Sequence, residues 1–200
     1  MDTPRLPLGP AALPGTYTAR LTVDGKSYTQ PFVVKMDPRV HTPAADLQQQ
    51  FALATHIASM IERDFDAVVE GRALLNQLQE TKTHNPGASA TVRAAIDTLH
   101  AHVEALRITR LNSTLGGLLE TLDGVDARPT TQATAAVSAL QQQLDAAIAD
   151  WNRVRGSELN SLNAKLKAAG IPAVAIPADL APFRNSLQQG ETADKDDNDP

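Results

Sequence analysis

The hydrophobic pattern of this chain changes its period once along its length. Between residues 16 and 36 apolar and polar side chains alternate, and Asp24-Gly25 interrupts the alternation at its middle. A period of two indicates a strand, and Asp-Gly is a preferred pair for a two-residue type I′ turn. This segment therefore predicts a β-hairpin. From residue 42 onward apolar side chains recur at steps of three and four, which predicts amphipathic helices that pack side by side.

A turn at Asp24-Gly25 fixes the pairing of the two predicted strands. Four large side chains then meet across the strands on one face, as the pairs Tyr17 with Phe32 and Leu21 with Tyr28. Two strands alone cannot bury such a face in water. Either the helices cover it, or the hairpin is the margin of a larger sheet. We take these four residues as a candidate interaction face.

Pro31 indicates which side of the hairpin would take another strand. In the predicted register Pro31 lies opposite Thr18 at a non-hydrogen-bonded pair, so its missing N–H would have pointed away from the first strand. The second strand is therefore expected to be a sheet edge. Additional strands are expected beside residues 17–23, and this is the physical case for a truncated sheet.

The helical part is expected to contain three to four long helices. The first begins at Thr42-Pro43 and ends at His84-Asn85-Pro86-Gly87. Shorter helices carry the apolar positions of residues 92–106 and 115–125, and the last runs over residues 131–169 with a kink at Gly156. The first helix has a heptad-like seam, widened by Leu53, Ile57 and Met60. The seam consists of Leu47, Phe51, Ala54, Ala58, Ile61, Phe65, Val68, Arg72 and Leu75.

The predicted fold class is therefore mainly α: a long-helix up-and-down bundle preceded by a β-hairpin that looks like the end of an Ig-like sheet. Residues 1–15 form a Pro-rich linker, 16–36 the hairpin, and 42–182 the bundle, whose last residues form an extended strap. Residues 188–200 are polar and acidic and are expected to be disordered.

Composition excludes several classes of protein. The chain has 200 residues and no cysteine, so disulfides and zinc–thiolate sites are excluded. Its formal net charge is −5, most of which lies in the acidic last ten residues, and no basic stripe favours nucleic acid. No apolar run reaches the length of a membrane span, and no secretory signal is visible at the start. The compartment is not indicated.

The two histidines of the second predicted helix are candidate metal ligands. His100 and His102 stand two residues apart, so they point to different sides of a helix and cannot share one ion. His100 and Glu104 can meet, but two ligands make an incomplete site because structural zinc takes four. We therefore expect no metal ligand, and interpret these histidines as half-buried residues at the edge of the core.

Four carboxylates of the first helix are the only acids whose spacing suggests sugar chemistry. Glu62, Asp64, Asp66 and Glu70 resemble the paired acids of glycosidases, but nothing places them in a cleft, and Arg63 and Arg72 lie nearby. We interpret them as a solvated face.

The remaining side chains that could bind a ligand also favour structural roles. Trp151 could stack on a ligand but falls on an inner seam, and Asn163 lies between core leucines, where it is expected to donate a buried hydrogen bond. No nucleophile elbow, phosphate loop or zinc-protease motif occurs. We predict no catalytic residue and no cofactor.

Residues 13–31 and 34–40, where the hairpin joins the first helix, resemble the C-terminal region of large bacterial BNR-repeat or sortilin-like glycosyl hydrolases. Residues 110–112, 126–130 and 159–163 fit the same helical region. The resemblance implies an exported protein in which a β-propeller and a short Ig-like sheet precede this helical end. The propeller would hold the sugar-cleaving residues. Its Ser-x-Asp-x-Gly-x-Thr-Trp pattern is not found in this sequence, so no catalytic residue is carried over.

Three functions remain open from the sequence. The first is a non-catalytic C-terminal accessory or structural module of such a protein, or a truncated fragment of one, whose partner is the propeller or the Ig-like portion. The second is a part of a glycoside hydrolase that contributes a wall of its substrate cleft. The third is a helical interaction protein that forms a homo-oligomer. We expect no enzymatic activity from this chain alone, no binding to nucleic acid and no membrane span.

Overall fold

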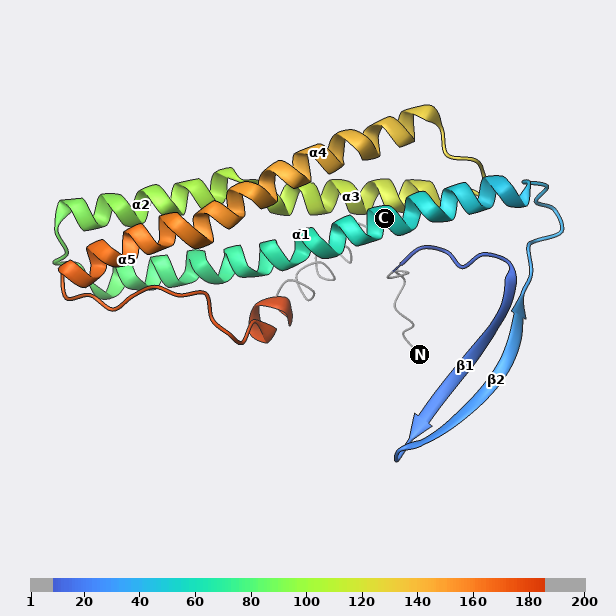
Figure 1. Ribbon diagram of the computed structural model, residues 1–200, viewed down its shortest axis with the longest axis horizontal. Coiled ribbons are helices and arrows are strands. Elements are labelled where there is room, and N and C mark those ends of the chain that lie inside the picture. The colour runs from blue at the N-terminus through green and yellow to red at the C-terminus, as the bar shows by residue number, and fades with distance from the viewer. Residues whose placement is uncertain (1–8, 186–200) are drawn as a thin grey trace, which may run out of the picture. The chain divides into compact units, whose positions relative to one another are not determined.

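A computed structural model describes residues 9–185 and is mainly helical, with a two-stranded hairpin at its N-terminal end (Figure 1). The predicted fold class is thereby confirmed. The acidic segment 188–200 and residues 1–8 of the predicted linker lie outside the described residues. The elements in chain order are β1 (Gly15–Val23), β2 (Lys26–Val34), α1 (Ala44–His84), α2 (Ala90–Ala105), α3 (Ile108–Asp123), α4 (Thr131–Arg153), the π-helical turn η1 (Val154–Glu158) and α5 (Leu159–Ala168).

The hairpin has the predicted register. β1 and β2 are antiparallel, with Tyr17 opposite Phe32, Leu21 opposite Tyr28 and Thr18 opposite Pro31. The turn residues Asp24 and Gly25 both have positive φ, at 49° and 77°. These values define the type I′ turn, whose twist matches that of the flanking strands. Local turn chemistry and alternation therefore determine this part of the fold.

Two compact units are formed by segments that are distant in sequence. The first contains residues 9–60 and 114–139, and the second contains residues 61–113 and 140–185. Helices α1, α3 and α4 each contribute residues to both units. We describe each unit separately.

In the first unit a buried glutamine ties α1 to the end of α3. Its buried apolar side chains come from three helices, and Gln50 lies buried among the α1 positions. The Gln50 Nε2 donates to the carbonyl oxygens of Leu122 and Val125, each at 2.6 Å. The Leu122 carbonyl lies in the last turn of α3, where helix carbonyls lack intrahelical donors, and Val125 follows two residues after the end of the helix. The apolar residues of this core include Leu47, Ala54, Ile57, Met60, Leu115, Leu122 and Val137.

Replacing Gln50 by leucine is expected to destabilise the fold by about 2 kcal/mol, because two carbonyls would lose their donor in a buried place. Urea denaturation followed by circular dichroism would measure the change. Gln49→Leu is the matched control, since Gln49 is an exposed neighbour on the same helix. Equal stability of the two variants would show that the Gln50 contacts contribute nothing.

The second unit contains the larger core. Helix α2 lies alongside α5 and η1 (Figure 1). Its buried positions Val92, Ile96, Leu99 and Val103 form the predicted seam. They join buried residues of α1, of the segment from Trp151 to Leu166, and of the strap. The other members of this core are Ala67, Val68, Leu74, Leu78, Ile108, Trp151, Val154, Leu159, Leu162, Leu166 and Val174.

The buried seam of α1 differs from the predicted one at every second position. Both seams share the buried Leu47, Ala54 and Val68 and the half-buried Ile61 and Leu75, but the intervening positions lie one residue away from those predicted. Phe51 is 36% exposed and Arg72 is exposed, whereas Asp64 is fully buried. The intervening buried residues are Gln50, Asp64, Gly71 and Leu78, together with Ile57, which is buried with Met60 as the widened apolar stripe predicts. The predicted alternatives were Phe51, Ala58, Phe65 and Arg72.

The last helical stretch ends as its sequence predicts. Gly170 has a φ of 69°, and the N–H of Ile171 bonds to the carbonyl of Leu166 at 2.9 Å, which is a Schellman ending. The strap then packs on α5: the Asn163 side chain donates to the carbonyl of Val174 and accepts from its N–H, both at 2.8 Å. Asn163 thus makes the expected hydrogen bonds. Gly156, the predicted kink, lies within the π-helical turn η1.

Candidate functional site

One side of the hairpin carries the four large apolar side chains that the sequence analysis singled out. We call Tyr17, Leu21, Tyr28 and Phe32 the hairpin face. Their exposed fractions are 36%, 62%, 60% and 48%, so the face is open to water. The rings of Tyr17 and Phe32 stack with centroids 5.9 Å apart, and the Tyr17 hydroxyl donates to the carbonyl of Leu13 at 2.7 Å. These contacts give the face a defined shape at one end.

The two edges of the hairpin differ chemically. Because a two-residue turn closes with a hydrogen-bonded pair, Thr18 and Pro31 form a non-hydrogen-bonded pair whose backbone groups point outward. The outer edge of β2 thus lacks a donor at Pro31, whereas β1 contains no proline. Within the described residues the sheet has only these two strands. The outer edge of β1 is the one that can accept another strand.

His100 and His102 each contact a carboxylate. His100 Nδ1 lies 3.4 Å from a carboxylate oxygen of Glu104, which is the contact that the sequence allowed. His102 Nδ1 lies 2.8 Å from Glu158, a residue 56 positions away that the sequence analysis did not single out. Among residues 9–185 no group of three or more potential ligands could hold a metal ion.

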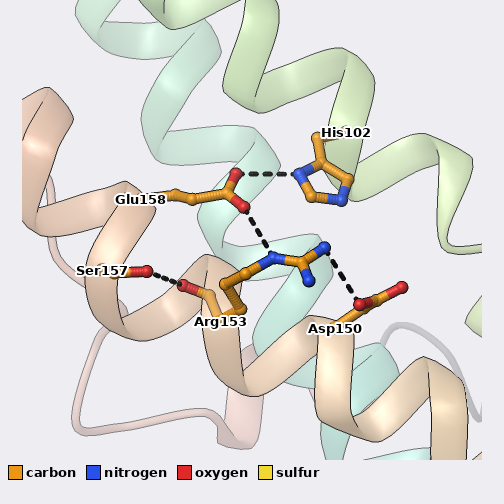
Figure 2. Close-up of polar contacts among 5 residues, drawn as sticks. All are labelled: His102, Asp150, Arg153, Ser157 and Glu158. Carbon is orange, nitrogen blue, oxygen red and sulfur yellow. Dashed lines mark hydrogen bonds and ion pairs between the residues drawn. The ribbon is translucent and has the colours of Figure 1, made fainter.

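Figure 2 shows the polar cluster around His102, Asp150, Arg153, Ser157 and Glu158. One carboxylate oxygen of Glu158 contacts the Nδ1 of His102. The other accepts a hydrogen bond from the Nε of Arg153 at 3.2 Å. Arg153 also pairs with Asp150 at 2.9 Å, and its carbonyl accepts the Ser157 hydroxyl at 3.2 Å. Partial burial raises the pKa of Glu158, but the hydrogen bonds from His102 and Arg153 outweigh it and hold the pKa below its ordinary value. The cluster ties α2 to η1.

The four carboxylates of α1 do not share one environment. Glu62 is exposed, and Asp66 pairs with Arg184 at 2.5 Å near the strap. The predicted solvated face therefore holds for these two. Asp64 contradicts the prediction because it is fully buried, and neither of its oxygens has a hydrogen-bond partner among the described residues.

Glu70 lies at the edge of the second core and anchors the only tryptophan. Its Oε2 accepts the Trp151 Nε1 at 2.9 Å and the Arg155 Nη1 at 3.2 Å. Trp151 is 2% exposed, in agreement with its predicted core position. These acids therefore face different partners, and they do not converge on one place as the two acids of a glycosidase do.

A shallow groove runs between the last helical stretch and the strap. It has a volume of about 740 Å³, and its lining includes Arg155, Asn160, Asn163 and Val174. Asn163 is fully engaged with the strap, and Arg155 pairs with Glu70. Asn163 and Arg155 thus serve the packing of this unit.

Comparisons with known proteins give no match: no family model, curated protein or solved structure is similar to this chain. Among the described residues no helix is both long and apolar enough to cross a membrane. The function is therefore argued from the geometry above.

Proposed function

We propose that this chain is a non-catalytic accessory module of an exported, BNR-propeller glycosyl-hydrolase-like protein, and that it joins the rest of that protein through its hairpin. The observation that carries the proposal is the exposed hairpin face, next to a β1 edge that has no strand partner within the described residues. The resemblance of residues 13–40 to the C-terminal region of such proteins supplies the identity of the partner.

The energetics of the hairpin favour a partner. Burying a tyrosine, leucine or phenylalanine side chain contributes about 1.5–3 kcal/mol relative to leaving it in water. The hairpin face holds four such side chains on a two-stranded sheet, which is marginally stable by itself. A neighbouring strand on β1 would add backbone hydrogen bonds, and a second layer of the partner packed on the extended sheet would bury this face. In the second unit, the polar side chains around Glu158 and Glu70 bond to one another and hold the helices together, which supports a structural role for that unit.

The test is a binding measurement with separately produced protein. The partner is a propeller-plus-Ig-like fragment from a protein whose C-terminal region resembles residues 13–40. We expect a one-to-one complex by calorimetry and by light scattering. The double variant Leu21→Lys/Tyr28→Lys is expected to weaken binding at least about a hundredfold, since two anchors of about 1.5 kcal/mol or more each would be lost and about 1.4 kcal/mol corresponds to a tenfold change.

The matched control places the same charges on the opposite side of the hairpin. Thr18→Lys/Thr29→Lys is expected to bind as the unchanged chain does, because these residues lie on the other side of the strands. Equal weakening by both double variants, or no complex with the fragment, would overturn the proposal. Turnover of an aryl glycoside that is lost on Glu62→Gln or Asp66→Asn would also overturn it.

Self-association is the alternative that the same exposed face favours. In that case the mass of the isolated chain in light scattering would rise with concentration, and Leu21→Lys/Tyr28→Lys would abolish the rise. A constant monomer mass would exclude it.

A further inference from the structure

The carboxyl group of Asp64 lies in the interior of the second unit. The residue is fully buried on α1, and neither carboxylate oxygen has a hydrogen-bond partner within residues 9–185. A buried carboxylate without partners is unstable in its charged form. The neutral acid is favoured because it carries no charge and has an O–H that can donate.

The charged residues next to Asp64 on its own helix are engaged elsewhere. On α1 Arg63 pairs with Asp145 of α4 at 3.0 Å, and Asp66 pairs with Arg184. Both pairs are exposed to solvent. Neither supplies a counter-charge to the buried carboxyl.

On the side of α3, the group that acts on Asp64 is an amide. The Asn112 Nδ2 donates to the carbonyl of Ile61 at 3.3 Å, three residues before Asp64. Burial raises the pKa of Asp64 to about 7, and the Asn112 side chain lowers this pKa by a smaller amount. Among the described residues, no cationic side chain is a cause of this shift.

The backbone just before α3 contains a residue in an uncommon conformation, Arg107, which we call the Arg107 joint. Between α2 and α3, Arg107 adopts a φ of 51°, a conformation that is uncommon for a residue with a side chain. Residues held in such sparsely populated conformations cluster at active sites, ligand clamps and switch regions. The first turns of α3, residues 108–113, follow immediately and carry Asn112. A change around the Asp64 carboxyl and the neighbouring Asn112–Ile61 hydrogen bond can therefore move residues 108–113 without disturbing α2.

We propose that Asp64 is a proton-controlled switch: with its carboxyl protonated, α1 packs closely on the first turns of α3, and with the carboxyl ionised this packing loosens about the Arg107 joint. The loosened state admits water to the carboxylate. The switch operates around neutral pH, where a small change in acidity alters the population of the two states. It is independent of the partner proposed for the hairpin.

Hydrogen exchange of the intact chain tests this proposal. Amide protection in residues 61–68 and 108–113, corrected for intrinsic exchange, is expected to fall at least about tenfold between about pH 5 and about pH 9. Asp64→Asn keeps the shape but cannot ionise, so its protection is expected to stay constant. Asp66→Asn, the exposed neighbour, is expected to retain the fall. Constant protection in the unchanged chain, or an equal fall in Asp64→Asn, would overturn the proposal.

A second measurement does not depend on a variant. The carboxyl carbons of the aspartates can be followed by NMR through the same pH range. One aspartate, assigned as Asp64 by its connection to neighbouring amides, is expected to titrate near neutrality. A midpoint for Asp64 below about pH 5 would overturn the proposal, because that value is ordinary for an exposed aspartate.

Discussion

The variant Trp151→Ala is expected to lose about 3–5 kcal/mol of unfolding free energy, as other large aromatic residues do when truncated in a core. Trp151 is 2% exposed and belongs to the second core, so its removal leaves a cavity between α4 and α1. The variant also removes the indole N–H that Glu70 accepts at 2.9 Å. That carboxylate would keep only Arg155 as its partner. Urea denaturation followed by circular dichroism would measure the loss.

Two controls separate the cavity from the hydrogen bond. Trp151→Phe retains most of the ring volume but not the N–H, and we expect it to lose about 1–2 kcal/mol. Glu70→Gln retains an acceptor and is expected to change the free energy by less than Trp151→Phe does. A loss below about 1 kcal/mol for Trp151→Ala would contradict the core position of the ring. In the unchanged chain the fluorescence of this single tryptophan reports the unfolding of the second unit.

The hairpin could be predicted in full because its determinants are local. Asp24 and Gly25 tolerate the positive φ that a type I′ turn needs, and the turn then fixes every pair of the register. Pro31 shows which edge is chemically blocked. The sequence could not decide whether helices cover the hairpin face, because that depends on contacts between distant segments.

The seam of α1 was ambiguous in a way that periodicity cannot resolve. Two series of alternating steps of three and four share Leu47, Ala54, Ile61, Val68 and Leu75. The sequence favoured the series through Phe51 and Phe65, which are apolar. The chain instead buries the series through Gln50, Asp64 and Gly71. Hydrophobic pattern alone therefore misses positions at which polar residues such as Gln50 and Asp64 are buried.

The contacts of the polar clusters were also beyond sequence reasoning. Trp151 and Glu70 are 81 positions apart, and His102 and Glu158 are 56 apart. One signal did exist for Asp64: it stands seven residues after Ile57 and seven before Gly71, in a seam of heptad spacing. Burying a charged residue at such a position costs folding free energy unless the charge is paired or neutralised. Asp64 is therefore the residue of α1 whose burial most needs an explanation.

Replacing Asp64 by leucine is expected to stabilise the chain at pH 8 more than at pH 4, by up to about 4 kcal/mol. The pKa rises from 3.8 to about 7 in the folded chain, and each pKa unit corresponds to about 1.4 kcal/mol. Since the folded state holds this proton more tightly, the contribution of Asp64 to stability falls as the pH rises from about 4 to about 7 and is level above that. Leucine has no such dependence.

The comparison between the two pH values removes two other effects. Leucine differs from aspartate in shape, but the resulting packing cost is the same at both values. The carboxyls of Asp37, Asp145 and Glu158 have lowered pKa values, so their stabilisation is lost as the pH falls; it is lost equally in both proteins.

Thermal and urea unfolding at the two pH values would measure the difference, with Asp66→Leu as the exposed control. Asp66 pairs with Arg184 at the surface, and such pairs contribute less than about 1 kcal/mol, so this variant is expected to follow the unchanged chain at both pH values. A stability difference between Asp64→Leu and the unchanged chain that is the same at both pH values would show that the buried carboxyl does not titrate near neutrality. The seam of α1 would then hold an ionised aspartate whose charge the fold compensates by other means.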